Sequence, residues 1–168
     1  MPQPIARRPL LAGAAALAAG TILRPREARA AKALNLVLES EATILDPHFI
    51  TAAITRTFGL HVFDMLFAMD GQGAIRPQMV EAWEVAADRL AWNFRLREDL
   101  AWHDGTPVTA AECVLSLRRW APRDALGRML LAATAAMDAT DARSFRIALK
   151  QPFPLMLEVL GKPNAPLP

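Results

Sequence analysis

The sequence LREDLAWHDGTPVTAAECVLSLRRW, residues 96–120, decides the fold expected for this chain. A half-buried strand leads into it, because apolar and polar residues alternate over residues 90–97. Asp104-Gly105 then turns the chain. Thr109 is followed three residues later by Glu112, which is the spacing of a capping box at a helix start. The stretch therefore predicts a strand, a turn and a helix that begins within a residue or two of Thr109.

The predicted helix has one apolar face, because its apolar residues recur at three- and four-residue spacing. These residues are Ala110, Cys113, Val114, Leu117, Trp120 and Ala121. Arg118 and Arg119 fall outside this face. Cys113 is the only cysteine in the sequence and cannot form an internal disulfide. On the apolar face we expect it to be a small buried hydrophobic residue rather than a nucleophile.

This block resembles the signature of the extracytoplasmic solute-binding proteins of the peptide/nickel-binding family, family 5, which serve ABC transporters. The matching residues are Leu96-Arg97, Trp102, His103, Asp104-Gly105-Thr106-Pro107 and Thr109-Ala110-Ala111-Glu112, whereas Cys113 replaces the usual Asp. Two more landmarks occur in the family's order: Leu45-Asp46-Pro47, and residues 76–85, which match Pro-x-Leu-Ala-x-x-Trp-x-Val. The resemblance extends from residue 34 to about residue 160 and covers only the family's N-terminal portion.

The resemblance implies an α/β fold, the N-terminal part of a type II periplasmic binding-protein-like fold with mixed sheets and packed helices. The chain then has three parts. Residues 1–30 are an export signal, residues 31–45 are the first strand and cleft loop of lobe I, and residues 46–168 are an α+β accessory domain. Family members run several times this length and close their cleft with a second lobe. We therefore interpret the chain as truncated, with an accessory domain that is incomplete at its C-terminus.

Periodicity predicts further elements outside the signature block. They are a strand over residues 34–38, a largely buried helix over about residues 51–67, a strand with Phe145, Ile147 and Leu149 on one face, and a short helix over residues 155–160. The helix over residues 51–67 would place His61 and Asp64 on one face. An ion pair is one interpretation of these two residues, and a local contact on the helix surface is the one we favour.

The first thirty residues have the composition of an export signal. Arg7-Arg8 precede an Ala-, Gly- and Leu-rich segment, residues 10–23, and Ala28-Arg29-Ala30 forms a small-x-small cleavage site. The pattern resembles a twin-arginine signal, with a general secretory signal as the alternative. A membrane-anchoring or buried amphipathic helix fits less well, because the segment is short and Ala and Gly bind lipid weakly. We expect a periplasmic protein that begins at Ala31.

The charge of the chain depends on this first segment. Residues 1–30 hold five of the nineteen basic residues and one of the seventeen acidic ones. The remainder has 14 basic and 16 acidic residues, a net charge of −2. A basic surface for nucleic acid is therefore not indicated, and we expect no nucleic-acid partner.

The sequence does not predict a catalytic, metal or cofactor site. His48, His61 and His103 stand 13 and 42 residues apart, which is not the spacing of a metal-binding pair on a helix. Acid–base chemistry is one interpretation of His103-Asp104, but hydrogen bonding of Asp104 to the backbone of a turn is favoured. Phosphate-binding, dinucleotide-binding and nucleophile-elbow motifs do not occur in the sequence. We therefore expect a binding protein that has no cofactor and is not an enzyme.

The resemblance places ligand binding in the loop after the first predicted strand, Ser40, Glu41, Ala42 and Thr43. Glu41 and exposed backbone groups would meet an amine or amide of the ligand; the alternative is that Glu41 is only solvated. The acidic residue that binds a peptide's amino terminus in the family would lie beyond residue 168. The resemblance implies a monomer with two kinds of partner. One is the ligand, a peptide or another small polar solute, and the other is the permease subunits of an ABC importer. The competing functions are an exported enzyme and a non-binding accessory domain.

Overall fold

Four antiparallel strands form the main sheet of the protein. The computed structural model describes residues 35, 37–38, 40–41, 43–49 and 52–162. The elements belong to one compact unit, Leu38–Pro168. The strands of the main sheet are, in spatial order, β3 (Val80–Val85), β4 (Ala91–Leu96), β6 (Ser144–Leu149) and β5 (Thr134–Ala139). A second, two-stranded sheet consists of β1 (Phe67–Met69) and β2 (Ile75–Pro77).

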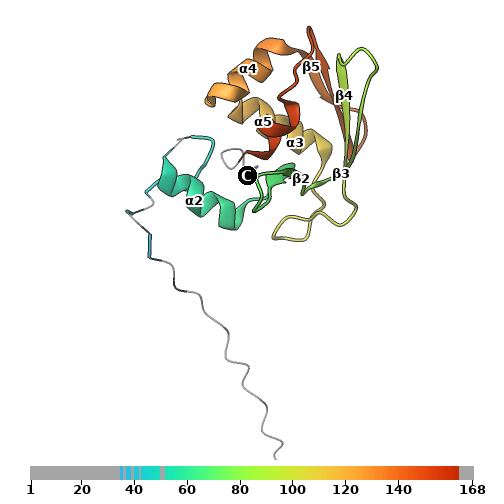
Figure 1. Cartoon of the computed structure of the whole chain (residues 1–168). Helices are drawn as coiled ribbons and strands as arrows, with labels where there is room; N and C mark the ends of the chain where they lie inside the picture. The colour runs from blue at the N-terminus through green and yellow to red at the C-terminus, as the bar shows by residue number, and fades with distance from the viewer. Residues whose placement is uncertain (1–34, 36, 39, 42, 50–51, 163–168) are drawn as a thin grey trace, which may run out of the picture. The chain divides into compact units, whose positions relative to one another are not determined.

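Helices cover one side of the main sheet, as Figure 1 shows. The described helices are α2 (Ala53–Val62), α3 (Ala110–Trp120), α4 (Ala125–Ala133) and α5 (Met156–Gly161). Helix α3 contacts β5 and β6, and α5 contacts α4 and the small sheet. Within the described part of the chain, no helix is both long enough and apolar enough to cross a membrane.

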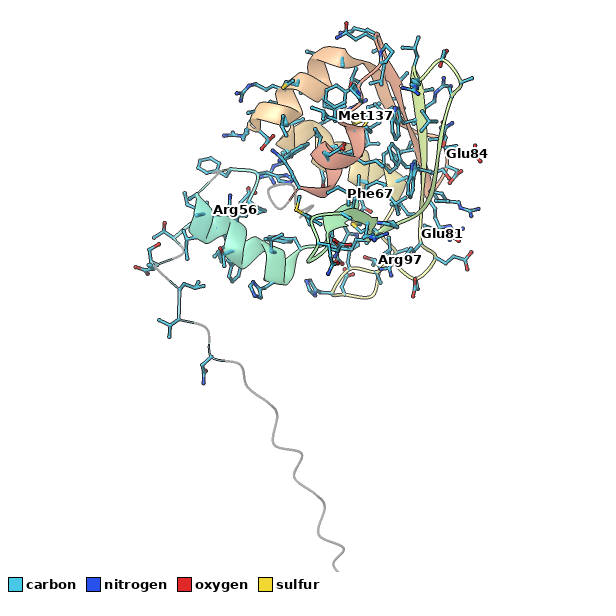
Figure 2. The ribbon with its side chains drawn as sticks, viewed as in Figure 1. Arg56, Phe67, Glu81, Glu84, Arg97 and Met137 are labelled. Atoms are coloured by element: carbon cyan, nitrogen blue, oxygen red, sulfur yellow. The ribbon has the colours of Figure 1, made fainter. Side chains whose placement is uncertain are left out.

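The core lies between this sheet and its helices, and aromatic residues fill its centre. Phe94 of β4 stacks on Phe145 of β6 with ring centroids 5.0 Å apart, and Phe67 of β1 meets Phe94 edge-on at 6.0 Å. Figure 2 shows Phe67 and Met137 in the interior of the body. These contacts join the small sheet to the main one, because one aromatic cluster packs against both.

The signature block folds as predicted. Phe94 and Leu96 are buried in β4 while Asn93 and Arg95 are exposed. The Thr109 hydroxyl accepts from the Glu112 amide at 3.4 Å, and the Glu112 carboxylate accepts from the Thr109 amide at 2.7 Å. The capping box is therefore confirmed, and α3 begins at the next residue. The predicted apolar face is buried, with Ala110, Cys113, Val114, Leu117, Trp120 and Ala121 in the core.

Helix α4 begins at a second cap. The Asp124 carboxylate accepts from the amides of Leu126 and Gly127 at 2.8 and 2.9 Å. Glycine is required at position 127, because a Cβ atom there would lie 2.7 Å from the Ala121 Cα atom. The first turn of α4 can therefore approach the end of α3 closely.

The largely buried helix predicted over residues 51–67 is too long at its C-terminal end and is less buried than predicted, since Thr55 and Gly59 are the buried residues of α2. Helix α2 ends at Val62, Phe63 has extended backbone angles, and Phe67 starts a strand. The Leu66 carbonyl accepts from the amides of Gln78 and Val80, at 3.1 and 3.3 Å. Hydrogen bonds from the amides of residues 78–80 thus replace the helical ones. The consecutive apolar residues 65–67 are all buried, as in a strand that is covered on both faces.

The expectation that His61 and Asp64 share a helical face changes with it. Asp64 lies outside the helix, where its carboxylate accepts from the Gln78 side-chain amide at 2.7 Å. The His61 ring instead contacts the Thr57 carbonyl at 2.7 Å, so the two residues do not share a helical face.

The strand predicted over residues 34–38 is not found at its described residues Asn35, Val37 and Leu38. A strand needs a neighbouring strand, and no described strand pairs with them.

Candidate functional site

The predicted ligand loop lies at the surface, at the beginning of the compact unit. Ser40, Glu41 and Thr43 are exposed, and Ala42 is outside the described residues. The predicted signal residues Arg7, Arg8, Ala28 and Ala30 are outside them as well. The loop thus offers two hydroxyls and one carboxylate to solvent, which are groups that can bind a polar ligand.

A tight turn follows the loop at the Leu-Asp-Pro landmark. The Phe49 amide donates to the Asp46 carbonyl at 3.1 Å, and the His48 amide donates to the Asp46 carboxylate at 2.9 Å. Asp at the first position and Pro47 at the second are the residues that favour such a turn. Pro47 and His48 are buried. The landmark therefore reverses the chain immediately after the exposed loop.

Two arginines hold this turn against the C-terminal end of α3. Both Arg119 amino groups contact the Asp46 carboxylate, with 3.3 Å between Nη1 and Oδ1 and a second bond from Nη2 to Oδ2. The Arg123 guanidinium lies 5.2 Å from the centre of the Phe49 ring and donates to the Phe49 carbonyl at 3.4 Å. We call Asp46, Phe49, Arg119 and Arg123 the N-terminal anchor. A forked guanidinium–carboxylate pair also fixes orientation, because its two bonds are parallel.

Helix α2 attaches the same segment at a second point. The Thr55 hydroxyl donates to the Ile44 carbonyl at 2.7 Å, and Thr55 is buried. Ile44 directly follows the ligand loop. The loop is therefore held on its C-terminal side by α2 at residue 44 and by α3 at residue 46.

The ionisation of Asp46 favours this arrangement at neutral pH. Partial burial alone would raise the pKa of Asp46, but hydrogen bonds from Arg119 and the His48 amide, together with the Arg119 charge, outweigh it. The pKa of Asp46 consequently lies below its ordinary value of 3.8. The carboxylate is charged at neutral pH, as the ion pair requires.

The turn in the signature block is structural, as favoured from the sequence. The Asp104 carboxylate accepts from the Thr106 amide at 2.9 Å and from its hydroxyl at 2.7 Å. These bonds, the hydroxyl's first, hold the pKa of Asp104 below its usual value. Gly105 has a φ of 85°, a left-handed conformation that glycine adopts without strain. Asp104 and Thr106 therefore stabilise the turn.

Cys113 is an inert core residue. Its side chain is buried, and burial, followed by the charge of Glu112, raises the pKa of the thiol from 9.0 to about 12. A thiolate, the nucleophilic form, is therefore scarce at neutral pH. The prediction of a buried hydrophobic role is confirmed.

One cavity adjoins the signature turn, between the end of α2 and the start of α3. Its volume is about 140 Å³, and Val62, Phe63, Trp102, His103 and Cys113 contribute to its walls. This is below the several hundred Å³ typical of ligand pockets. Among the described residues, no three His, Cys, Asp or Glu side chains gather in a way that could hold a metal ion. The exposed loop with its two attachments is thus a better candidate site than this cavity.

Comparison with known proteins identifies the family. Residues 74–168 match the family of bacterial extracellular solute-binding proteins, family 5 Middle. The chain is 42% identical over 162 residues to the probable peptide ABC transporter periplasmic-binding protein y4tO of Sinorhizobium fredii, covering 94% of this chain and 30% of that protein. It is 30% identical over 149 residues to the periplasmic oligopeptide-binding protein OppA of Salmonella typhimurium, covering 77% of this chain and 27% of that protein.

A solved structure agrees with the sequence relatives. The structure of MoaA from A. tumefaciens R10, in complex with mannopinic acid, superposes with a TM-score of 0.64 at 32% identity, covering 75% of this chain and 27% of that one. The chain spans about 30% of the length of the curated relatives it matches.

These comparisons confirm the fold class expected from the signature, part of a type II periplasmic binding-protein fold, and the antiparallel sheets with packed helices agree with it. The family consists of solute-binding proteins, so the alternative of an exported enzyme is not supported. With the match over residues 74–168 and the 42% identical relative, the chain belongs to the bacterial extracellular solute-binding proteins, family 5.

Proposed function

We propose that this chain supplies the first ligand-contacting loop of a periplasmic solute receptor that delivers peptides to an ABC importer. Membership of family 5 is the observation that carries the proposal. The relatives y4tO and OppA are named as binding proteins for peptides and oligopeptides. Receptors of this kind bind a solute between lobes, and the permease recognises the closed state.

The loop Ser40–Thr43 is the proposed contact with the ligand. Its described residues are exposed, and two attachments hold the chain that follows it. A loop on a rigid support loses little conformational entropy when a ligand binds. Glu41 would accept hydrogen bonds from a peptide's amine or amide groups, and the backbone of the loop would provide the others.

The location and division of the chain are part of the same proposal. Residues 1–30 would direct export, by the twin-arginine route, and be removed before Ala31. Residues 31–45 would belong to the lobe that meets the ligand, and residues 46–168 to the accessory domain. The relatives named as periplasmic support this location. The receptor would act as a monomer, without nucleic acid.

Isothermal titration of the gene product with peptides of two to five residues tests the proposal. We expect binding, and we expect Glu41→Gln to weaken it about tenfold, because a charge-assisted hydrogen bond is lost. Glu84→Gln is the matched control, since Glu84 is exposed on β3, on the outer side of the body (Figure 2), and should leave affinity unchanged.

Two results would contradict the proposal. Absence of peptide binding alongside binding of mannopinic acid would place the protein with receptors such as MoaA, whose structure was solved in complex with mannopinic acid. Equal effects of Glu41→Gln and Glu84→Gln would show that the loop carboxylate does not contact the peptide.

A further inference from the structure

The ligand loop is followed by two attachments that are two residues apart. The Thr55 hydroxyl of α2 holds the Ile44 carbonyl at 2.7 Å, and Arg119 of α3 holds the Asp46 carboxylate with two bonds. A single attachment fixes the place of an extended chain but leaves its direction free. A second one, two residues further on, fixes the direction too.

The backbone between these points has little freedom. Pro47 restricts Asp46 to extended angles. In the turn that follows, the His48 amide donates to the Asp46 carboxylate and the Phe49 amide donates to the Asp46 carbonyl. Asp46 is three residue steps from Thr43, a span of at most about 11 Å. Asp46 and Ile44 together therefore set the direction in which the chain enters the loop.

The Arg119–Asp46 pair is poorly placed to stabilise the whole fold. Its side chains are 53% and 33% exposed, and exposed ion pairs contribute little to the free energy of unfolding. Its forked geometry is specific in direction, however, and the cation–π contact between Arg123 and Phe49 supports it on the other side of the turn. The pair is thus suited to orient a segment.

We infer that Arg119 is a positioning residue for ligand binding, because through Asp46 it fixes the direction of the chain that follows the described loop residues Ser40, Glu41 and Thr43. It touches no ligand itself. The signature helix α3 thereby has a second role, in addition to its place in the core. The consequence for affinity rests on the proposed function, whereas the consequence for the loop does not.

Hydrogen exchange of residues 38–49, peptide affinity and melting temperature, measured on the same variants, test the inference. In Arg119→Gln we expect exchange in this segment to rise about fivefold and affinity to fall about fivefold, with an unchanged melting temperature. Arg119→Lys keeps the charge but loses the forked pair of hydrogen bonds. Its exchange rate and its affinity should lie between those of the wild type and Arg119→Gln. Exchanging the partners, Arg119→Asp with Asp46→Arg, should restore part of the loss.

Arg118→Gln is the matched control. Arg118 precedes Arg119 on α3, has the same charge and is 55% exposed, but it pairs with Asp138 at 3.0 Å and with the Met137 carbonyl at 2.5 Å. Its replacement should leave exchange of residues 38–49 unchanged.

Unchanged exchange in Arg119→Gln, or an equal increase in Arg118→Gln, would overturn the inference. So would a loss of affinity that accompanies a lower melting temperature and is not recovered by the exchanged pair. Wild-type protein that binds no peptide would overturn the proposed function instead, and the exchange result alone would then decide whether Arg119 orients the loop.

Discussion

Two ion pairs, Arg119–Asp46 and Lys162–Asp124, hold segments near the two ends of the α+β unit, and they differ mainly in burial. The Asp46 and Arg119 side chains of the N-terminal anchor are 33% and 53% exposed. Asp124 and Lys162, which we call the C-terminal anchor, are 9% and 16% exposed. A water-exposed pair can open at little cost, whereas a buried one opens only with its surroundings. The first is therefore suited to orient a segment and the second to hold the fold together.

The C-terminal anchor also joins three elements. The Lys162 ammonium lies 2.6 Å from both Asp124 carboxylate oxygens and 5.7 Å from the centre of the Trp120 ring. The same carboxylate caps α4. Asp124 thus holds the start of α4, and Lys162 links it to the end of α3 and to the chain after α5.

Removing Asp124 should have the largest effect in this comparison. Asp124→Ala deletes a helix cap and leaves the Lys162 charge buried without its carboxylate, for which we expect a loss of about 3 kcal/mol of unfolding free energy. Denaturant titration measures it. Asp46→Ala serves as the control and should cost at most about 1 kcal/mol. Similar losses in both variants would show that burial does not distinguish the two anchors.

Removing the other partner should cost less. In Lys162→Met the side chain can still cover Trp120, and the Asp124 carboxylate keeps the two α4 amides as donors. We expect a loss of about 1.5 kcal/mol by the same titration, since a hydrogen-bonded charge at a helix N-terminus is partly compensated. A loss as large as that of Asp124→Ala would show that the capping amides do not compensate the carboxylate.

The smallest effect is expected when acid protonates the Asp46 carboxylate of the N-terminal anchor. The folded pKa of Asp46 is below 3.8, so its ion pair is fully formed above that pH and is lost as the pH falls through the folded value. A carboxyl titration by NMR should find the midpoint of Asp46 below 3.8 in the wild type and closer to 3.8 in Arg119→Gln. Circular dichroism must show a folded chain throughout. Identical midpoints in the two proteins would mean that Arg119 does not bind Asp46 in solution.

The local parts of the fold could be predicted, and the parts that depend on distant partners could not. Strand β4 and helix α3 follow from apolar alternation and a capping box, which involve residues close in sequence. The end of α2 was predicted wrongly, because apolar residues 65–67 fit a helical period but form hydrogen bonds with residues 78–80. Strand β5 was not predicted, since only Met137 of its six residues is buried.

The sequence by itself determined the family, the capped signature helix and the place of the loop that we propose meets the ligand. Only the tertiary structure decided what supports that loop. Arg119 is a charge outside the apolar face of α3 in the sequence, and its partner Asp46 lies 73 residues away. A helical period shows which side of a helix is buried, but it carries no information about which distant carboxylate meets the other side. That pairing depends on how α3 and the segment after the loop come together in the folded chain.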